Sequence, residues 1–272
     1  MLSELEPKPF LRWAGSKRKL LPILIKYWKP TYHRYFEPFV GSAQLFYSIK
    51  EHSKFVLSDK NNELIETYLR IRNNPYEVHR ILKGFTNSKK SYYEIRALNP
   101  RDLGVNQRAA RFIFLNWLCF NGLYRTNVNG QFNVPYSGES AKSLDNWSLL
   151  KRASGKLQSA LILEGDFEVV VRSKLGANDF VYLDPPYALE NQRIFTQYCN
   201  HTFGLKDIER LSALLEYINS SGSFFLMSYA NTAKTSEIFK HWNVREVLVQ
   251  RNIAGFSEYR RKSSELLITN IF

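Results

Sequence analysis

The chain has 272 residues, 44% of them hydrophobic and 23% charged, which is ordinary for a globular protein long enough to bury a core. Its net charge of +13 and its 15% aromatic content favour a nucleic acid as partner, although basic proteins are common and aromatic residues usually belong to a core. Two distant cysteines, scattered histidines, no signal peptide and no apolar run of membrane length argue against a disulfide framework, a zinc site and membrane insertion, so we expect a metal-free cytoplasmic protein.

Short apolar runs that end in a polar or turn residue recur along the chain and predict strands of a mostly parallel sheet. We expect the last two of these strands to form an antiparallel pair that flanks a basic loop. The predicted strands are residues 35–36, 55–57, 161–163, 180–183, 223–228, 244–250 and 265–269.

Apolar residues at three-four spacing predict helices between these strands, and the strand signal disappears between residues 62 and 155. We therefore expect an α/β domain formed by residues 1–61 and 156–272, with a mainly helical insertion at residues 62–155. Within the insertion, a loop over 121–140 follows the predicted helices. The predicted helices are residues 20–27, 44–49, 63–72, 76–84, 91–98, 107–119 and 205–219.

The tetrapeptide Asp184-Pro185-Pro186-Tyr187 directly follows the predicted strand 180–183. Its prolines fix φ and lack N–H donors, so the turn offers carbonyl oxygens and a carboxylate but no donor of its own. An amino group on a heteroaromatic ring, as in adenine, has two N–H donors for these acceptors, and Tyr187 offers a face for the ring. The same tetrapeptide also fits a simple strand end.

A second set of residues suits an adenosine cofactor. Gly41 lies in the turn of Glu37-Pro38-Phe39-Val40-Gly41, and Asp59 follows at the interval at which dinucleotide folds place the acid that binds ribose. The further glycines of a phosphate cradle are missing, which favours S-adenosylmethionine over a nicotinamide dinucleotide. Trp13 and Lys17 add a ring and a cation for its methionine part, although this segment also fits an N-terminal arm with a buried tryptophan.

Five motifs along nearly the whole chain resemble those of the Dam-like family of DNA adenine-N6 methyltransferases (the α-type, or D12 class). The motifs are Phe-x-x-Trp-x-Gly-x-Lys at 10–17, Glu-Pro-Phe-x-Gly at 37–41, Asn-Gly-Leu-x-Arg at 121–125, Phe-Asn-Val-Pro at 132–135 and Asp-Pro-Pro-Tyr at 184–187. Two departures, Ser16 and Ser42-Ala43 in place of commoner glycine positions, are small residues that still allow a close approach of the cofactor.

The resemblance implies a Rossmann-like methyltransferase sheet whose helical insertion is the target-recognition domain. It implies catalytic roles for Asp184, Pro185 and Tyr187. Contacts with S-adenosylmethionine are implied for Trp13, Lys17, Glu37, Phe39, Gly41, Asp59 and Asp184. Contacts with DNA are implied for Arg12, Phe120, Asn121, Leu123 and Arg125.

Within that set, Phe120 matches an aromatic residue that enters the base stack, and Arg12 matches a residue that reads a guanine in members specific for GATC. Arg125 either reads a base or clamps a phosphate. For Arg260, Arg261 and Lys262 we advance the hypothesis of a loop that tracks the DNA backbone, against the alternative of a solvated hairpin tip.

The expected function is therefore site-specific methylation of N6 of a flipped adenine in duplex DNA, within GATC, by a monomer that uses S-adenosylmethionine and no metal. A cognate restriction endonuclease is a further partner that such an enzyme can have. Two alternatives stay open: a methyltransferase of the same fold acting on RNA adenine or protein glutamine, and a non-catalytic DNA-binding module.

Overall fold

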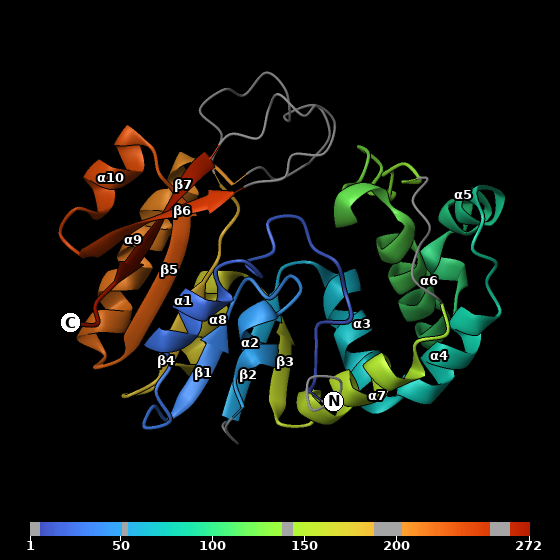
Figure 1. Cartoon of the computed structure of the whole chain (residues 1–272), viewed down its shortest axis with the longest axis horizontal. Helices are drawn as coiled ribbons and strands as arrows, with labels where there is room; N and C mark the ends of the chain where they lie inside the picture. Colours follow the sequence, from blue (N-terminus) through green and yellow to red (C-terminus); the bar gives the residue numbers. More distant parts are fainter. Residues whose placement is uncertain (1–5, 51–53, 138–143, 188–202, 251–261) are drawn as a thin grey trace.

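The computed structural model describes residues 6–50, 54–137, 144–187, 203–250 and 262–272 of the chain (Figure 1). A seven-stranded sheet has the order β3-β2-β1-β4-β5-β7-β6, with β7 antiparallel to both of its neighbours and the other pairs parallel. The strands are β1 (Arg34–Glu37), β2 (Lys54–Asp59), β3 (Ala160–Glu164), β4 (Phe180–Leu183), β5 (Phe224–Ala230), β6 (Asn243–Gln250) and β7 (Lys262–Thr269). All seven predicted strands are thus confirmed, including the antiparallel pair at the end.

Helices lie on both faces of the sheet, and helices also make up most of the chain between β2 and β3. They are α1 (Leu21–Leu24), α2 (Gln44–Ser48), α3 (Asn62–Asn73), α4 (Pro75–Lys83), α5 (Lys89–Ala97), α6 (Val105–Leu118), α7 (Trp147–Leu157), α8 (Phe167–Lys174), α9 (Leu205–Ser220) and α10 (Ala233–Phe239). Short 3-10 turns are η2 (Ile25–Tyr27), η3 (Pro100–Asp102) and η4 (Phe120–Gly122). The predicted helices are confirmed, but α7, α8 and α10 were not predicted.

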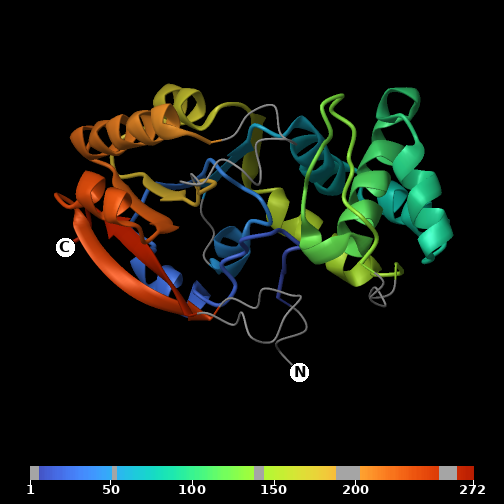
Figure 2. The same cartoon turned by 90° about the horizontal axis from the view of Figure 1, so that it is seen from above.

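Alternate side chains of the strands pack into two hydrophobic cores, one on each face of the sheet. On β4, Phe180 and Tyr182 join the core that includes α1 and α2, whereas Val181 and Leu183 join the core beneath α8 and α9. Figure 2 shows α8 and α9 on one face of the sheet and α1 on the other. A strand buried on both faces reads as one continuous apolar run, which is why β4 was recognisable from sequence.

The helical segment between β2 and β3 packs around α6. Every residue from Ala109 to Leu118 on this helix is buried, and α6 contacts α3, α4 and α5. The chain before α1 docks on the same helix, because the indole of Trp117 donates to the carbonyl of Phe10 at 2.7 Å. The helical segment and the sheet are therefore joined by the N-terminal segment as well as by the chain connections at α3 and α7 (Figure 1).

The described part of the chain contains no helix long and apolar enough to cross a membrane. Within the same residues, no group of three metal-ligating side chains comes together.

A buried ion pair fixes the amino end of β1 to the turn before β4. The Asp179 side chain is fully buried and accepts from Arg34 Nε at 3.0 Å and Arg34 Nη2 at 2.6 Å. The same carboxylate accepts from the backbone N–H of Gly176 at 2.7 Å. Two parallel guanidinium bonds and a backbone bond thus satisfy a charge that would be costly to bury alone.

We expect Asp179→Ala to lower the free energy of unfolding by about 3 kcal/mol, because it leaves Arg34 without its buried counter-charge. Urea denaturation of the two proteins measures this difference. The matched control is Glu237→Ala, which breaks an exposed ion pair with Lys240 and should cost less than about 0.5 kcal/mol. Equal losses in the two variants would contradict the importance of the buried pair.

Candidate active site

The predicted catalytic residues follow one of the two central strands of the sheet, at the point from which successive strands are added in opposite directions. From β1 the sheet extends through β2 to β3 on one side, and through β4 to β5 on the other. Glu37 ends β1, and Asp184 directly follows β4, its neighbour in the sheet. Open α/β sheets bind ligands at the carboxyl ends of the strands at such a point.

Asp184 is the centre of a hydrogen-bonded cluster. Its Oδ1 lies 2.8 Å from the ammonium of Lys17 and accepts from the hydroxyl of Ser228 at 3.0 Å. Burial raises the pKa of Asp184, while Lys17 and Ser228 oppose the rise by favouring the ionised form. With 22% of its side chain exposed, the carboxylate is held firmly and still open to a ligand.

Lys17 is buried between two carboxylates. Its ammonium donates to the carbonyl of Gly15 at 3.1 Å, lies 3.8 Å from Glu265 Oε2 and lies 5.2 Å from the ring centroid of Tyr187. Burial alone would lower the pKa of Lys17, but Asp184, Tyr187 and Glu265 together raise it, so the group is charged. The motif that contains Lys17 predicts a contact of this cation with the cofactor, and the structure shows its contact with Asp184.

Tyr187 is positioned by the strand next to β4. Its ring packs edge-on against Tyr229 of β5, with the ring centroids 5.3 Å apart. Pro185 is buried and Pro186 exposed, so the turn carries Tyr187 back toward the sheet edge beside Lys17.

Gly41, Asp59 and Trp13 meet at the carboxyl ends of β1 and β2. Gly41 has φ +44°, and a Cβ there would lie 2.8 Å from Cδ1 of the Trp13 indole, so only glycine fits beneath this ring. Asp59 accepts from the backbone N–H groups of Asn61 at 3.0 Å and of Gly41 at 3.4 Å. Burial raises the pKa of Asp59, and these backbone donors oppose the rise.

Glu37 and Phe39 complete the predicted cofactor set, but Glu37 faces the interior. Only 3% of Glu37 is exposed, and it accepts from the hydroxyl of Tyr35 at 2.9 Å. Burial raises the pKa of Glu37 to about 8. Phe39 is half-buried and stacks on Phe167 of α8.

The predicted DNA-contacting residues gather beside α6, at the start of the 121–137 loop. Both the backbone N–H and the carbonyl of Arg12 bond the side chain of Asn116, and its guanidinium donates to the carbonyl of Trp117 at 3.0 Å. Gly122 has φ +62°, and a Cβ there would lie 2.7 Å from Cβ of Arg12. The structure therefore brings Arg12 against the Asn-Gly-Leu motif, over a hundred residues away in sequence.

Phe120, directly before this loop, is 40% exposed; within the loop, Asn121 is exposed with φ +54° and Leu123 is half-buried. The guanidinium of Arg125 donates from Nε to Oδ1 of Asn133 at 2.7 Å, across the base of the loop. Arg260 and Arg261 lie outside the described residues. Lys262 begins β7, and its side chain is likewise outside the description.

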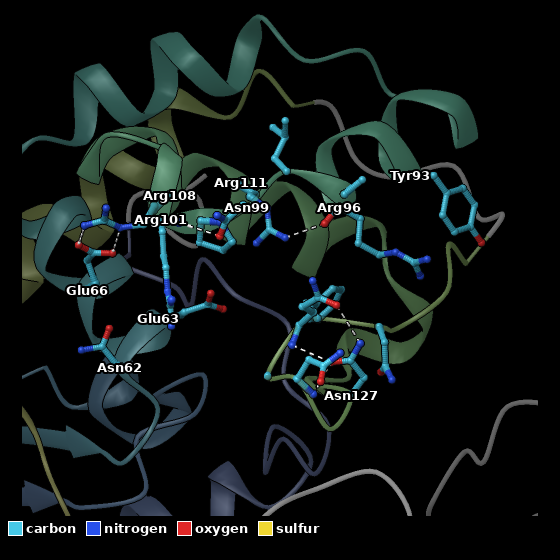
Figure 3. Close-up of a pocket in the computed structure, with 18 residues that line it drawn as sticks. Asn62, Glu63, Glu66, Tyr93, Arg96, Asn99, Arg101, Arg108, Arg111 and Asn127 are labelled. Atoms are coloured by element: carbon cyan, nitrogen blue, oxygen red, sulfur yellow. Dashed lines mark hydrogen bonds and ion pairs between the residues drawn. The ribbon is translucent and has the colours of Figure 1, made fainter.

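A cleft of about 1010 Å³ opens between the 121–137 loop and helices α3, α5 and α6 (Figure 3). Arg108 in its wall forms two hydrogen bonds with Glu66, of 2.7 and 2.5 Å. The four arginines that line it are Arg96, Arg101, Arg108 and Arg111, against the two acids Glu63 and Glu66. The net positive wall beside the exposed loop suits a polyanion.

Sequence reasoning assigned no role to Ser228, Glu265 or Tyr124. The available signal was a serine inside the otherwise apolar β5 for Ser228, and a glutamate directly before the apolar run of β7 for Glu265. Tyr124 stacks on Trp13 at 6.1 Å, and its hydroxyl donates to Glu63 of α3 at 2.9 Å. No pattern in the sequence predicts this contact, because it depends on how the loop folds back on the N-terminal segment.

Comparison with known proteins matches residues 13–253 to the family model described as D12 class N6 adenine-specific DNA methyltransferase. The chain is 34% identical to the type II methyltransferase M1.LlaDCHI of Lactococcus lactis subsp. cremoris, covering 97% of this chain and 95% of that protein. It is 33% identical to the type II methyltransferase M.MjaIII of Methanocaldococcus jannaschii, over 98% and 100%. It is 32% identical to the DNA adenine methylase of Escherichia coli K12, over 96% and 94%.

The raised pKa of Glu37 predicts a pH dependence of stability. The folded state keeps this proton up to a pKa of about 8, whereas the ordinary value is 4.5. The stabilisation is complete below the ordinary pKa and is lost as the pH rises through the folded value. We expect Glu37→Gln to remove this dependence, so that the variant loses less stability than the wild type between about pH 5 and 8.

Denaturant unfolding at several pH values measures how the free energy of unfolding changes with pH in the wild type and in Glu37→Gln. Parallel curves for the two proteins would show that Glu37 is ionised in the folded state.

Proposed function

This chain belongs to the D12 class N6 adenine-specific DNA methyltransferases, and we propose that it transfers the methyl group of S-adenosylmethionine to an adenine flipped out of duplex DNA. The observation that carries the proposal is the Asp184 carboxylate, fixed through one oxygen by Lys17 and Ser228 at the switch point of the sheet. The chain is accordingly an adenine-specific DNA methyltransferase, and the base flipping, the cofactor contacts and the recognition site are proposals.

The residues at the ends of β1 and β2 fit the adenosine part of S-adenosylmethionine. Gly41 allows a close backbone approach. Among the described residues, the half-buried carboxylate of Asp59 accepts from the backbone N–H groups of Gly41 and Asn61, and a carboxylate has further acceptor capacity for a ribose hydroxyl. In this proposal the cofactor contacts are those of Trp13, Lys17, Phe39, Gly41, Asp59 and Asp184. Glu37 belongs to the same predicted set, but its side chain faces the core and supports the site from within. When bound, S-adenosylmethionine supplies a methyl group activated by a sulfonium.

Asp184, Pro185 and Tyr187 hold the adenine. The Asp184 carboxylate and the Pro185 carbonyl accept the two hydrogens of the exocyclic amine, and the ring stacks on Tyr187. Acceptors placed for a tetrahedral nitrogen favour localisation of its lone pair, which is otherwise delocalised into the base. No base has to remove a proton beforehand, because the nitrogen becomes acidic only after methylation.

Residues 62–155 form the target-recognition domain in this proposal, and residues 1–61 and 156–272 the catalytic domain. Arg12, Phe120, Asn121, Leu123 and Arg125 are proposed to contact DNA, supported by the packing of Arg12 against Gly122 of the Asn-Gly-Leu motif. Phe120 is exposed enough to enter the stack left by the flipped base, and an aromatic wedge offsets part of the cost of unstacking. GATC is the proposed site.

Arg260, Arg261 and Lys262 precede or begin β7, and we assign them to the DNA backbone. The arginine-lined cleft beside the 121–137 loop supports a positively charged path for the duplex. A monomer suffices for one flipped base, and a restriction endonuclease of the same specificity is the proposed partner in a restriction-modification pair.

Methylation of a plasmid by the purified protein, with the modified adenines mapped at base resolution, tests this function. We expect N6-methyladenine at one short sequence and label transfer to duplex DNA but not to RNA or protein. Transfer to RNA or to protein glutamine instead would overturn the proposal.

We expect Asp184→Ala to reduce methyl transfer by at least about a thousandfold, because the acceptor for the amine is lost. DNA binding should persist, since the recognition residues lie elsewhere. Single-turnover methylation and a DNA-binding isotherm of the same preparation separate the two effects. Methylation near the wild-type rate would refute the role of Asp184.

For Arg125→Ala we expect a loss of about 1–3 kcal/mol in preference for the cognate site over a one-base variant. Binding constants on the two duplexes at fixed salt provide the measurement. An equal loss on both duplexes would identify Arg125 as a phosphate contact instead.

A further inference from the structure

Ser228 is a fully buried polar residue in the middle of β5. Its strand lies between β4, which leads to Asp184, and β7, where Ser228 pairs with Leu267. A buried hydroxyl is costly unless it is hydrogen-bonded. The contacts of Ser228 therefore show what it does at this position.

The hydroxyl of Ser228 is bonded on both sides. It lies 3.0 Å from Oδ1 of Asp184 and 3.2 Å from the hydroxyl of Tyr182. An ionised carboxylate only accepts, so the single proton of Ser228 is donated to Asp184 and the proton of Tyr182 to Ser228. Burial raises the pKa of Tyr182 well above its ordinary value, which keeps that proton in place.

Ser228 and Lys17 converge on the same oxygen of Asp184. Lys17 Nζ is 2.8 Å from Oδ1, the atom that also accepts from Ser228. The two contacts come from different parts of the fold, the N-terminal segment and the centre of β5. Together they fix the rotation of the carboxylate about its axis, which neither contact fixes alone.

We propose that Ser228, supported by Tyr182, is a positioning residue that holds the Asp184 carboxylate through Oδ1 and so directs Oδ2 to the amino group of the target adenine. This inference rests on the proposed role of Asp184 as the acceptor for that amine. Tyr182 lies on β4 two positions before Asp184. By donating to a lone pair of the Ser228 oxygen, it orients the serine proton toward Asp184.

The same bond helps to keep Asp184 ionised. Burial raises the pKa of Asp184, Lys17 and Ser228 lower it, and Glu265 raises it. Removal of the serine hydroxyl should raise this pKa further, and a protonated carboxyl loses acceptor capacity. The titratable groups that interact with Asp184 are Lys17, Tyr35, Glu37, Tyr182, Tyr187 and Glu265.

The test compares Ser228→Ala and Ser228→Thr with the wild type in steady-state methylation of the mapped duplex. We expect kcat of Ser228→Ala to fall about 10- to 100-fold while KM for S-adenosylmethionine and DNA affinity change less than about threefold, because only the reacting geometry is disturbed. The acid limb of its kcat profile should move to higher pH. Ser228→Thr keeps a hydroxyl and should recover most of the rate.

Ser223→Ala is the matched control, because Ser223 is also a buried serine, beside β5, and donates to the carbonyl of Gly176 far from Asp184. It should cost stability without moving kcat or the acid limb. Tyr182→Phe retains the serine proton but loses the group that orients it, so we expect a smaller fall in kcat and a smaller shift of the acid limb to higher pH. This variant decides the question if Ser228→Ala does not fold.

An unchanged kcat and acid limb in Ser228→Ala, or in Tyr182→Phe where that variant decides, would overturn the positioning role while leaving the proposed function intact. Failure of the proposed function is distinguishable, because it would show as absence of adenine methylation by the wild type.

Discussion

The ion pair between Lys17 and Asp184 is the contact on which the candidate active site depends. It joins the N-terminal segment to the end of β4, more than 160 residues away in the sequence, at 2.8 Å. The buried ammonium offsets the cost of burying a carboxylate, and Glu265 on β7 adds a second negative charge at 3.8 Å. An ionised carboxylate that stays partly exposed is a strong acceptor for the hydrogens of an amine. Asp184 therefore owes its chemistry to a residue far away in sequence.

The same N-terminal segment connects the sheet to the helical segment. Arg12 is bonded to Asn116 through its backbone, and Trp117 donates to the carbonyl of Phe10, so the segment is held along α6. Trp13 follows directly, lying over Gly41 on one side and stacked on Tyr124 on the other. The proposed cofactor edge and the proposed DNA-contacting loop thus share one short segment of chain, which keeps their separation fixed by packing and backbone bonds rather than by a linker.

Much of this architecture was predictable because local sequence patterns indicate it. The β4 strand is continuously apolar, and α9 has its apolar residues at three-four spacing, so both were recognised. Helix α8 was not, since the run Val169-Val170-Val171 within it consists of β-branched residues typical of strands. It forms a helix because Asp166 accepts from the backbone N–H of Glu168 at its start and its apolar side packs on the sheet. Tertiary packing overrides a weak local preference here.

The α/β arrangement, the helical interruption between β2 and β3, and the reactive residues at the ends of the strands could all be predicted from the sequence. Hydrophobic periodicity and turn residues are local features, so they can be recognised in the sequence alone. The folded chain was needed to show that Lys17 contacts Asp184, that Glu37 faces the core with Tyr35, and that Ser228 bonds the same oxygen as Lys17. Such contacts depend on which strands lie side by side and on how the N-terminal segment crosses them. No local sequence pattern predicts contacts between residues so far apart in the chain.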